Sequence, residues 1–309
     1  MKNILYVFVL LLSLACSAKK TPSESPITVD ELLENAWKDY GEFRFGQARA
    51  SFYDIVNGNA ENLEAYYGLS LSSTSLGFYN EAYSYGITGT AVGGENILEL
   101  TVGSIVLDNN NYSTYYDTSR ISGNNYVFRI KLPHRNIVNI VSIAKGNLPI
   151  IYDTYYDSLI IGQAVLSELL KPGDTIIFSI QRTPNQKLNV YKWHLFTISS
   201  SAYYFDGKLV EAKNTALIPA YRDTSGTLAS RVRKKFSKAD LYINLVKVLN
   251  GLPDYILLAH ILNKIDSNWP NNSIGWNCGT WQLSTCDIKW VLSNLNQVKS
   301  KYYEVISQP

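Results

Sequence analysis

A pattern of residues that recurs after 34 positions restricts the fold of this chain more than any other feature of its sequence. Three positions carry the pattern: a bulky residue, then an aromatic residue, then an alanine. They are Leu32, Phe45 and Ala48 in the first unit and Tyr66, Tyr79 and Ala82 in the second. In each unit the aromatic residue precedes the alanine by one helical turn, and the small alanine admits a neighbouring helix. The pattern predicts helical hairpins over residues 29–93, and Thr28 with Glu31 predicts a capping box at their start.

Small and large residues are combined on the first helix of both units, as close helix packing requires. They are Ala36, Trp37 and Tyr40, followed in the second unit by Ala65, Gly68 and Leu69. Paired helices with a 34-residue period resemble the tetratricopeptide repeat. Two departures exist: Gly86 stands in the second unit at the position of Phe52 in the first, and neither unit ends in proline. The resemblance covers about a fifth of the chain. It implies a groove that binds a helix or an extended peptide of a partner. The residues expected near this groove are Trp37, Tyr40, Tyr66 and Leu69.

Two such units leave an apolar face uncovered, because each unit covers the face of its neighbour. Residues 95–107 are the candidate for a capping helix that would complete a helical region over residues 28–112. Leu98, Val102 and Ile105 have helical spacing, whereas Leu98, Leu100, Val102 and Val106 fit a strand. We expect the helix, because it covers the exposed face.

Residues 113–222 consist of short runs rich in Val, Ile, Tyr and Phe, separated by turn-forming residues. Such runs predict strands. The predicted strands cover residues 126–132, 137–143, 175–180, 190–199 and 202–206. The sequence Lys-Pro-Gly-Asp at 171–174 marks a turn into the third of them. This layout predicts a β-sandwich of immunoglobulin-like or similar type, without the cysteines of antibody domains.

Residues 223–309 return to helical patterns. Residues 237–250 and 253–265 predict a helical hairpin, and residues 288–305 carry an amphipathic stripe. The stripe consists of Ile288, Val291, Leu295, Val298, Tyr302 and Val305. The expected fold class is therefore α+β in several parts: tetratricopeptide-like hairpins, a central β-sandwich and a C-terminal helical segment.

The first residues indicate export. Lys2 precedes an apolar run over residues 4–14 that only Ser13 interrupts. The run is shorter than the roughly 20 residues that span a bilayer. Ending in Ser-Leu-Ala-Cys, residues 1–16 resemble a bacterial lipoprotein signal, which implies that Cys16 carries lipid, palmitate included. The alternative is an ordinary signal peptide cleaved near Ala15 or Ala18. If Cys16 carries lipid, Ser17 directly after it favours the outer membrane as the destination. Residues 17–27 have the composition of a flexible tether.

The chain has three cysteines, an odd number for an exported protein. If Cys16 carries lipid, Cys278 and Cys286 remain as a pair, and a disulfide between them would contribute roughly 2–3 kcal/mol. Zinc is the competing hypothesis, but two cysteines without a nearby third ligand make a poor site.

Enzyme motifs are not found in the sequence. His134, His194 and His260 lie in three different predicted elements, and there is no HExxH, Gly-x-Ser-x-Gly or Cys-x-x-Cys motif. A formal charge of +2 gives no general attraction to nucleic acid. We therefore expect neither an enzyme, nor a cofactor, nor a metal site.

Three further features have both a functional and a structural interpretation. A basic cluster (Arg231, Arg233, Lys234, Lys235 and Lys238) is either a contact for anionic polymers or, as we expect, a solvated segment. A tryptophan-rich loop (Trp269, Trp276 and Trp281) either stacks on a sugar or forms a small core. The sequence Thr-Tyr-Tyr-Asp at 114–117 recurs at 154–157, either as matching ligand loops, or by coincidence in a chain rich in Tyr and Asp, or as two similar strand edges.

The hypothesis that accounts best for these features is a non-enzymatic, lipid-anchored protein of the bacterial envelope that binds or scaffolds other proteins through its helical repeats. A carbohydrate-binding surface lipoprotein that uses the β part or the tryptophan-rich loop is the first alternative. An unrecognised envelope hydrolase is the second. The expected partners are a membrane, reached through the N-terminal lipid, and an envelope protein or a glycan, but not nucleic acid.

Overall fold

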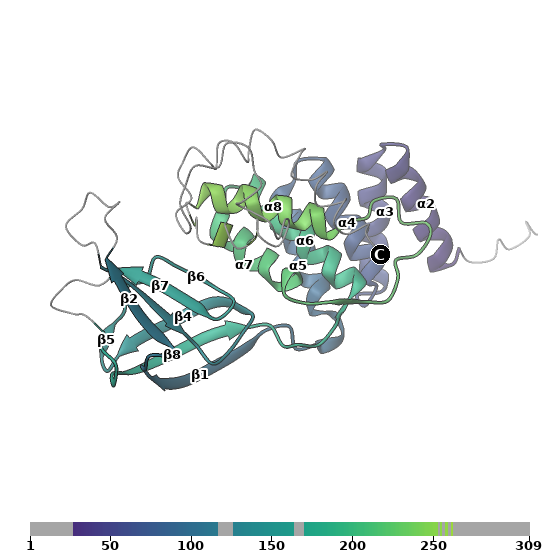
Figure 1. The fold of residues 1–309 in the computed structure, drawn as a ribbon. Helices are drawn as coiled ribbons and strands as arrows, with labels where there is room; N and C mark the ends of the chain where they lie inside the picture. The colour runs from purple at the N-terminus through teal and green to yellow at the C-terminus, as the bar shows by residue number, and fades with distance from the viewer. Residues whose placement is uncertain are drawn as a thin grey trace, which may run out of the picture.

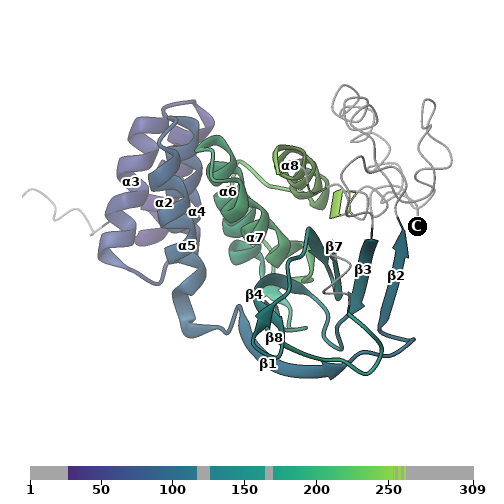
Figure 2. The ribbon, with the colours of Figure 1, turned by 90° about the vertical axis from the view of Figure 1, so that its left-hand side faces the viewer.

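The computed structural model describes residues 27–116, 126–163 and 170–252, together with residues 254, 257, 258 and 261. Helices and antiparallel sheets occupy separate parts of the molecule (Figures 1 and 2). Several predicted features lie outside the described residues: the predicted signal sequence with Cys16, the predicted disulfide pair Cys278 and Cys286, the tryptophan-rich loop and the stripe over 288–305. Within the described residues, no helix has the length and apolar character needed to cross a membrane.

The two N-terminal helical hairpins are confirmed. Their helices are α2 (Val29–Gly41), α3 (Phe45–Gly58), α4 (Leu63–Ser75) and α5 (Tyr79–Ala91). The capping box is confirmed as well, because the Thr28 side chain accepts a hydrogen bond from the Glu31 backbone N–H, and the Glu31 carboxylate accepts one from the Thr28 N–H. Of the residues that recur with the period, the two alanines are fully buried: Ala48 and Ala82 have no exposed surface.

A third hairpin follows at residues 190–220, where the sequence predicts strands over 190–199 and 202–206. It consists of α6 (Val190–Phe205) and α7 (Leu209–Ala220). The strand prediction is wrong because α6 lies inside the helical array, where α4, α5, α7 and α8 all contact it. Every residue over 192–200 is buried, so the sequence of α6 has no polar face to show a helical period.

The three hairpins share one turn geometry. In each turn, one residue adopts a left-handed conformation: Phe43 (φ 61°), Gly77 (φ 79°) and Gly207 (φ 77°). The next residue donates its N–H to the carbonyl five positions back, as in Arg44 to Asp39, and the same bond forms in the other two turns. This is the Schellman ending of a helix. Ala212 then occupies the position of Ala48 and Ala82, so the third hairpin is a repeat of the first two.

Two glycines allow α6 to pack directly against α5, although residues 92–189 separate the two helices in the sequence. A Cβ atom at Gly86 would lie 2.0 Å from Ser199 Oγ, and one at Gly89 would lie 2.9 Å from a methyl group of Leu195. The departure of Gly86 from the repeat pattern is therefore explained by close contact with the third hairpin.

The β part is inserted between α5 and α6. After the short helix η1 (Val92–Gly94) come the strands of two four-stranded antiparallel sheets, in the orders β1-β8-β4-β5 and β2-β3-β7-β6. Their bounds are β1 Glu99–Val106, β2 Tyr112–Tyr116, β3 Tyr126–Lys131, β4 Ile137–Lys145, β5 Leu148–Pro149, β6 Thr154–Tyr156, β7 Leu159–Gln163 and β8 Thr175–Arg182. Buried residues of both sheets form one hydrophobic cluster that includes Phe128, Ile137 and Phe178. Strands β3, β4 and β8 confirm three of the predicted strands.

The predicted capping helix over 95–107 is wrong, because residues 99–106 form β1. Their side chains alternate between half-buried and exposed, as on a strand with one solvent-facing side. The apolar face of the second hairpin, which the capping helix was expected to cover, is covered by α6. The Thr-Tyr-Tyr parts of the two recurring sequences fall on β2 and β6, the two edge strands of one sheet, which agrees with their interpretation as two similar strand edges.

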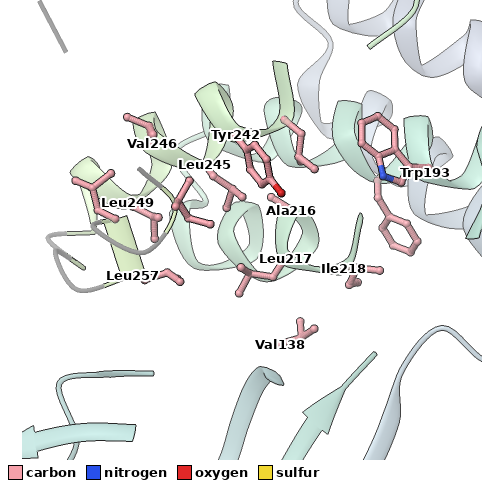
Figure 3. Packing of buried hydrophobic residues seen from close by; sticks show 14 of the residues in the cluster. Val138, Trp193, Ala216, Leu217, Ile218, Tyr242, Leu245, Val246, Leu249 and Leu257 are labelled. Carbon is pink, nitrogen blue, oxygen red and sulfur yellow. The ribbon is translucent and has the colours of Figure 1, made fainter. Parts of the chain in front are cut away.

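The β part and the helices meet in a buried contact. Val138 of β4 lies in a hydrophobic cluster with Ile218 of α7 and Leu245 of α8 (Lys238–Gly251), and Figure 3 shows it facing these helices. Helix α8 covers most of the predicted helix over 237–250. At the base of the inserted part, buried Lys192 and Arg222 both bind the carboxylate of Glu95, with N–O distances of 3.1 Å.

Arg222 also donates from Nε to the carbonyl of Gln186 at 2.7 Å. Arg222 thereby holds together the segment near Glu95, where the chain enters the β part, and the segment near Gln186, where it leaves the β part. Close by, the two short strands β9 (Leu188–Asn189) and β10 (Thr224–Ser225) pair in parallel.

Candidate functional site

The segment between α7 and α8 crosses the helical array instead of joining the two helices directly. Residues 226–237, called the strap here, contact α6, α4 and α2, the first helices of the three hairpins (Figure 1). We call the surface that these three helices form the first-helix face. Helix-to-helix connections in bundles usually need 2–8 residues, and residues 59–62 suffice between α3 and α4. The detour of the strap is therefore not required by connectivity.

Glu64 of α4 anchors the strap. Arg231 donates from Nε to Glu64 Oε1 at 2.5 Å and from Nη2 to Glu64 Oε2 at 3.2 Å, which makes a bidentate pair. The same carboxylate accepts hydrogen bonds from Trp37 Nε1 at 2.9 Å and from the Tyr191 hydroxyl at 3.0 Å. Arg231 also reaches Asp30 of α2 at 2.9 Å. One side chain of the strap thus binds all three helices, directly or through Glu64.

Two tyrosine hydroxyls of the first-helix face bind the backbone of the strap. Tyr67 donates to the carbonyl of Lys234 at 2.8 Å, and Tyr191 accepts a hydrogen bond from the N–H of Ala229 at 3.0 Å. Backbone contacts of this kind do not depend on the side chains of the bound segment, and they are typical of faces that bind extended peptides.

Apolar side chains complete the contact. Val232 is buried in the same cluster as Leu33 and Trp37, and the Phe236 ring lies 6.5 Å from the ring of Tyr67. At the far end, Arg233 lies against Gly41, the last residue of α2, so the strap spans the full width of the array.

The ionisation states fit this arrangement. Burial, opposed by a hydrogen bond to the backbone of Ala229, raises the pKa of Tyr191 to about 12. Burial also raises the pKa of Tyr67 well above its usual value. The hydrogen bond to Glu64 raises the pKa of Arg231 above that of a free guanidinium. At neutral pH both tyrosines are therefore neutral and able to donate, while Arg231 is charged.

His194 of α6 lies beneath the strap. Its Nδ1 hydrogen-bonds the carbonyl of Val190 at 2.8 Å, and its ring lies beside those of Tyr67 and Phe236. Burial lowers the pKa of His194 below its usual value, and hydrogen bonds to the backbone of Val190 and Phe236 only partly oppose this. The site therefore favours the neutral imidazole.

This lowered pKa predicts a loss of stability in mild acid. In the unfolded chain a histidine titrates at about 6.5, so below that pH the unfolded state binds the extra proton first. The free energy of unfolding should fall as the pH is lowered through about 6.5 toward the lower pKa of the folded state. Urea unfolding at several pH values between about 7.5 and 5.5 measures this slope. The variant His194→Asn should flatten it, whereas His134→Asn in the β part should not; equal slopes in all three proteins would contradict the prediction.

The structure places the predicted partner-binding residues differently from the sequence-based expectation. Trp37 and Leu69 have no exposed surface and Tyr66 has almost none, so all three belong to the core between the helices. Tyr40 stays partly exposed, with its hydroxyl 3.4 Å from Ser75 Oγ. The expectation of direct partner contact is corrected for the first three: in tightly packed hairpins, large apolar residues of the first helices face their neighbours.

No local sequence pattern marks the residues that form the site. Glu64 stands in the first turn of α4, where an acidic residue is ordinary. Arg231 belongs to the basic cluster that was expected to be solvated, and that interpretation holds for its exposed neighbours Arg233, Lys234 and Lys235 but not for Arg231.

Comparisons with models of protein families, with curated proteins and with solved structures found no match. The site must therefore be interpreted from its own chemistry.

Among the described residues, no group of three histidine, cysteine, aspartate or glutamate side chains is arranged to hold a metal ion. His134 lies in the β part, with its ring 5.9 Å from that of Phe178, and His194 lies in the helical array. His260 and Trp276 are among the residues that the structure does not describe. The carbohydrate and hydrolase alternatives remain predictions from the sequence.

Proposed function

We propose that this protein is a non-enzymatic, lipid-anchored protein of the bacterial envelope that binds other proteins through its tetratricopeptide-like helices. The first-helix face is the proposed binding surface, and the strap is a segment of the chain's own that occupies it. The observation that carries the proposal is the hydrogen bonding of Glu64, Tyr67 and Tyr191 to the strap. These contacts are those that an extended peptide would make.

The chemistry of the strap indicates which partner would fit. A matching segment has an arginine for Glu64, an apolar residue directly after it for the site of Val232, and an aromatic residue for the site of Phe236. Its backbone would use the hydroxyls of Tyr67 and Tyr191. We therefore propose a partner that presents an extended segment with this spacing.

The strap must leave before such a partner binds. It is held at both ends, by β10 and by α8, so its effective concentration at the face is high. A free peptide should consequently compete poorly with the strap in the unaltered protein. It should bind well once the strap is loosened.

A synthetic, fluorescently labelled peptide with the sequence of residues 226–237 tests the proposal by fluorescence anisotropy. A protein with Arg231→Ala and Val232→Asp, whose strap has lost both anchors, should bind this peptide at least about tenfold more tightly than the unaltered protein does. Adding Glu64→Gln to that protein, or replacing the peptide's arginine by alanine, should weaken binding again. If the loosened protein is folded by circular dichroism and yet does not bind the peptide, the first-helix face is not a peptide-binding surface.

The finer architecture is part of the same proposal. We propose that the two sheets form a β-sandwich of immunoglobulin-like or similar type, which their shared hydrophobic cluster supports. Residues 17–27 would connect lipid-bearing Cys16 to α2, with the outer membrane as the destination. The helical array would then lie close to the membrane, because α2 directly follows this tether.

A further inference from the structure

The edge of one sheet is open along a full-length strand. In the order β1-β8-β4-β5, β1 is an edge strand, and it pairs with β8 from Glu99 opposite Arg182 to Val106 opposite Thr175 without a shift in register. The other edge strands among the described residues are shorter: β5, β9 and β10 have two residues each, β6 has three and β2 has five. With eight residues, β1 offers much the longest edge.

The direction of its backbone groups follows from one hydrogen bond. The N–H of Leu107 donates to the carbonyl of Asp174 at 2.8 Å, on the side of β8. Because the direction of backbone groups alternates along a strand, residues 100, 102, 104 and 106 point their N–H and C=O groups away from β8. The Val106 carbonyl accepts a hydrogen bond from the Asn111 side-chain amide at 2.9 Å. The other outward-pointing groups of residues 100–106 have no backbone partner among the described residues and are available to another strand.

The same residues carry the exposed side chains. Leu100, Val102 and Val106 are 65%, 68% and 58% exposed, although all three are apolar. Natural sheets protect an open edge with a proline, a lysine, a bulge or a very short strand. Strand β1 has none of these, whereas the register shifts of this sheet lie in β4, an inner strand. The one charged residue of β1, Glu99, forms an ion pair with Arg182 at 3.0 Å.

We propose that two copies of this protein associate through their β1 strands, in antiparallel orientation about a two-fold axis, to form one continuous sheet. The second copy is the favoured occupant because β1 is complementary to itself. With Gly103 on the axis, Leu100 lies opposite Val106 of the second copy, and Val102 lies opposite Ser104. Outward-facing backbone groups then meet outward-facing groups, and exposed apolar side chains lie beside one another. No charged residues oppose each other, since residues 100–106 are all uncharged.

This pairing accounts for two observations at once, the free backbone edge and the exposed apolar residues beside it. Packing of sheet face on sheet face is the competing arrangement. It would use the exposed side chains across the whole sheet, including Val141 on β4. The two arrangements therefore differ in whether a substitution far from the β1 edge weakens the association of the two copies.

Sedimentation equilibrium of the full chain, with Cys16→Ala to prevent lipid attachment, tests the proposal. The unaltered β1 should give a monomer–dimer equilibrium. Val102→Lys and Ser104→Lys should each raise the dimer dissociation constant at least about tenfold, because they place cations at the shared edge. Val141→Lys, on the same face but away from the edge, should leave it unchanged.

A protein that is monomeric at every concentration would overturn the proposal, and so would an open series of larger species. Equal disruption by Val141→Lys and Val102→Lys would indicate face-to-face packing and would also reject it. Circular dichroism of each variant checks that the fold is kept. None of these measurements depends on peptide binding at the first-helix face, so the two proposals fail or succeed separately.

Discussion

Replacing Trp37 by alanine is expected to lower the free energy of unfolding by about 4 kcal/mol. The Trp37 side chain has no exposed surface, and its ring packs at 4.9 Å from that of Phe52 and at 6.0 Å from that of Tyr67. Its removal would leave a cavity between α2, α3 and α4 and would deprive Glu64 of a hydrogen bond. Urea unfolding followed by the helical circular dichroism signal measures the loss.

The variant Tyr53→Ala provides the control. Tyr53 is also an aromatic residue of the first hairpin, but it is 42% exposed and has one ring neighbour, Tyr85. Its replacement should lower the free energy of unfolding by less than about 1 kcal/mol. Should Trp37→Ala prove as mild as Tyr53→Ala, the contribution of Trp37 to the core of the first hairpin would be contradicted.

Replacing Glu64 by alanine is expected to lower the free energy of unfolding by about 2–3 kcal/mol. The change removes the acceptor shared by Arg231, Trp37 and Tyr191, and it leaves the half-buried guanidinium with only the exposed carboxylate of Asp30. The strap should loosen at the same time. Limited proteolysis after Arg233, Lys234 and Lys235 reports this directly, because trypsin cleaves after basic residues once the backbone is free.

The ion pair between Arg49 and Glu81 offers a matched control, since it joins the same two residue types in the same helical array. Both of its side chains are more exposed than those of Glu64 and Arg231. Glu81→Ala should therefore lower the free energy of unfolding by less than about 1 kcal/mol and leave the rate of strap cleavage unchanged. Equal effects of the two substitutions would show that Glu64 has no special role in holding the strap.

Local sequence patterns predicted those elements that carry a recurring motif or a typical strand composition, including α4, whose residues 64–73 are all buried. The first two hairpins follow from the 34-residue recurrence, and β3, β4 and β8 follow from their composition. Helix α6 could not be recognised in this way, because burial on all sides removes the amphipathic signal. One clue was present: Gly207 precedes Ala212 by the same interval that separates Gly77 from Ala82.

The candidate site depends on contacts that no local pattern encodes. Arg231 and Glu64 stand 167 positions apart, and nothing in the surroundings of either residue indicates the other. A basic residue in a polar connecting segment is usually solvated. The sequence therefore predicted the first two helical hairpins and their positions, whereas the occupied face became apparent only from the folded chain.

The place of the β part within the helical array has a consequence for the order of folding. Docking α6 on α5 must close a loop over residues 92–189, and the entropic cost of closing a loop grows with its length. Strands β1 and β8 are antiparallel neighbours, with Glu99 opposite Arg182, so a folded β part holds the two ends of this loop together. The loop that remains is several times shorter, which reduces the closure cost by roughly 1–2 kcal/mol. We therefore expect the sheets to form before the third hairpin docks, and the strap, whose contacts are the most distant in sequence, to settle last.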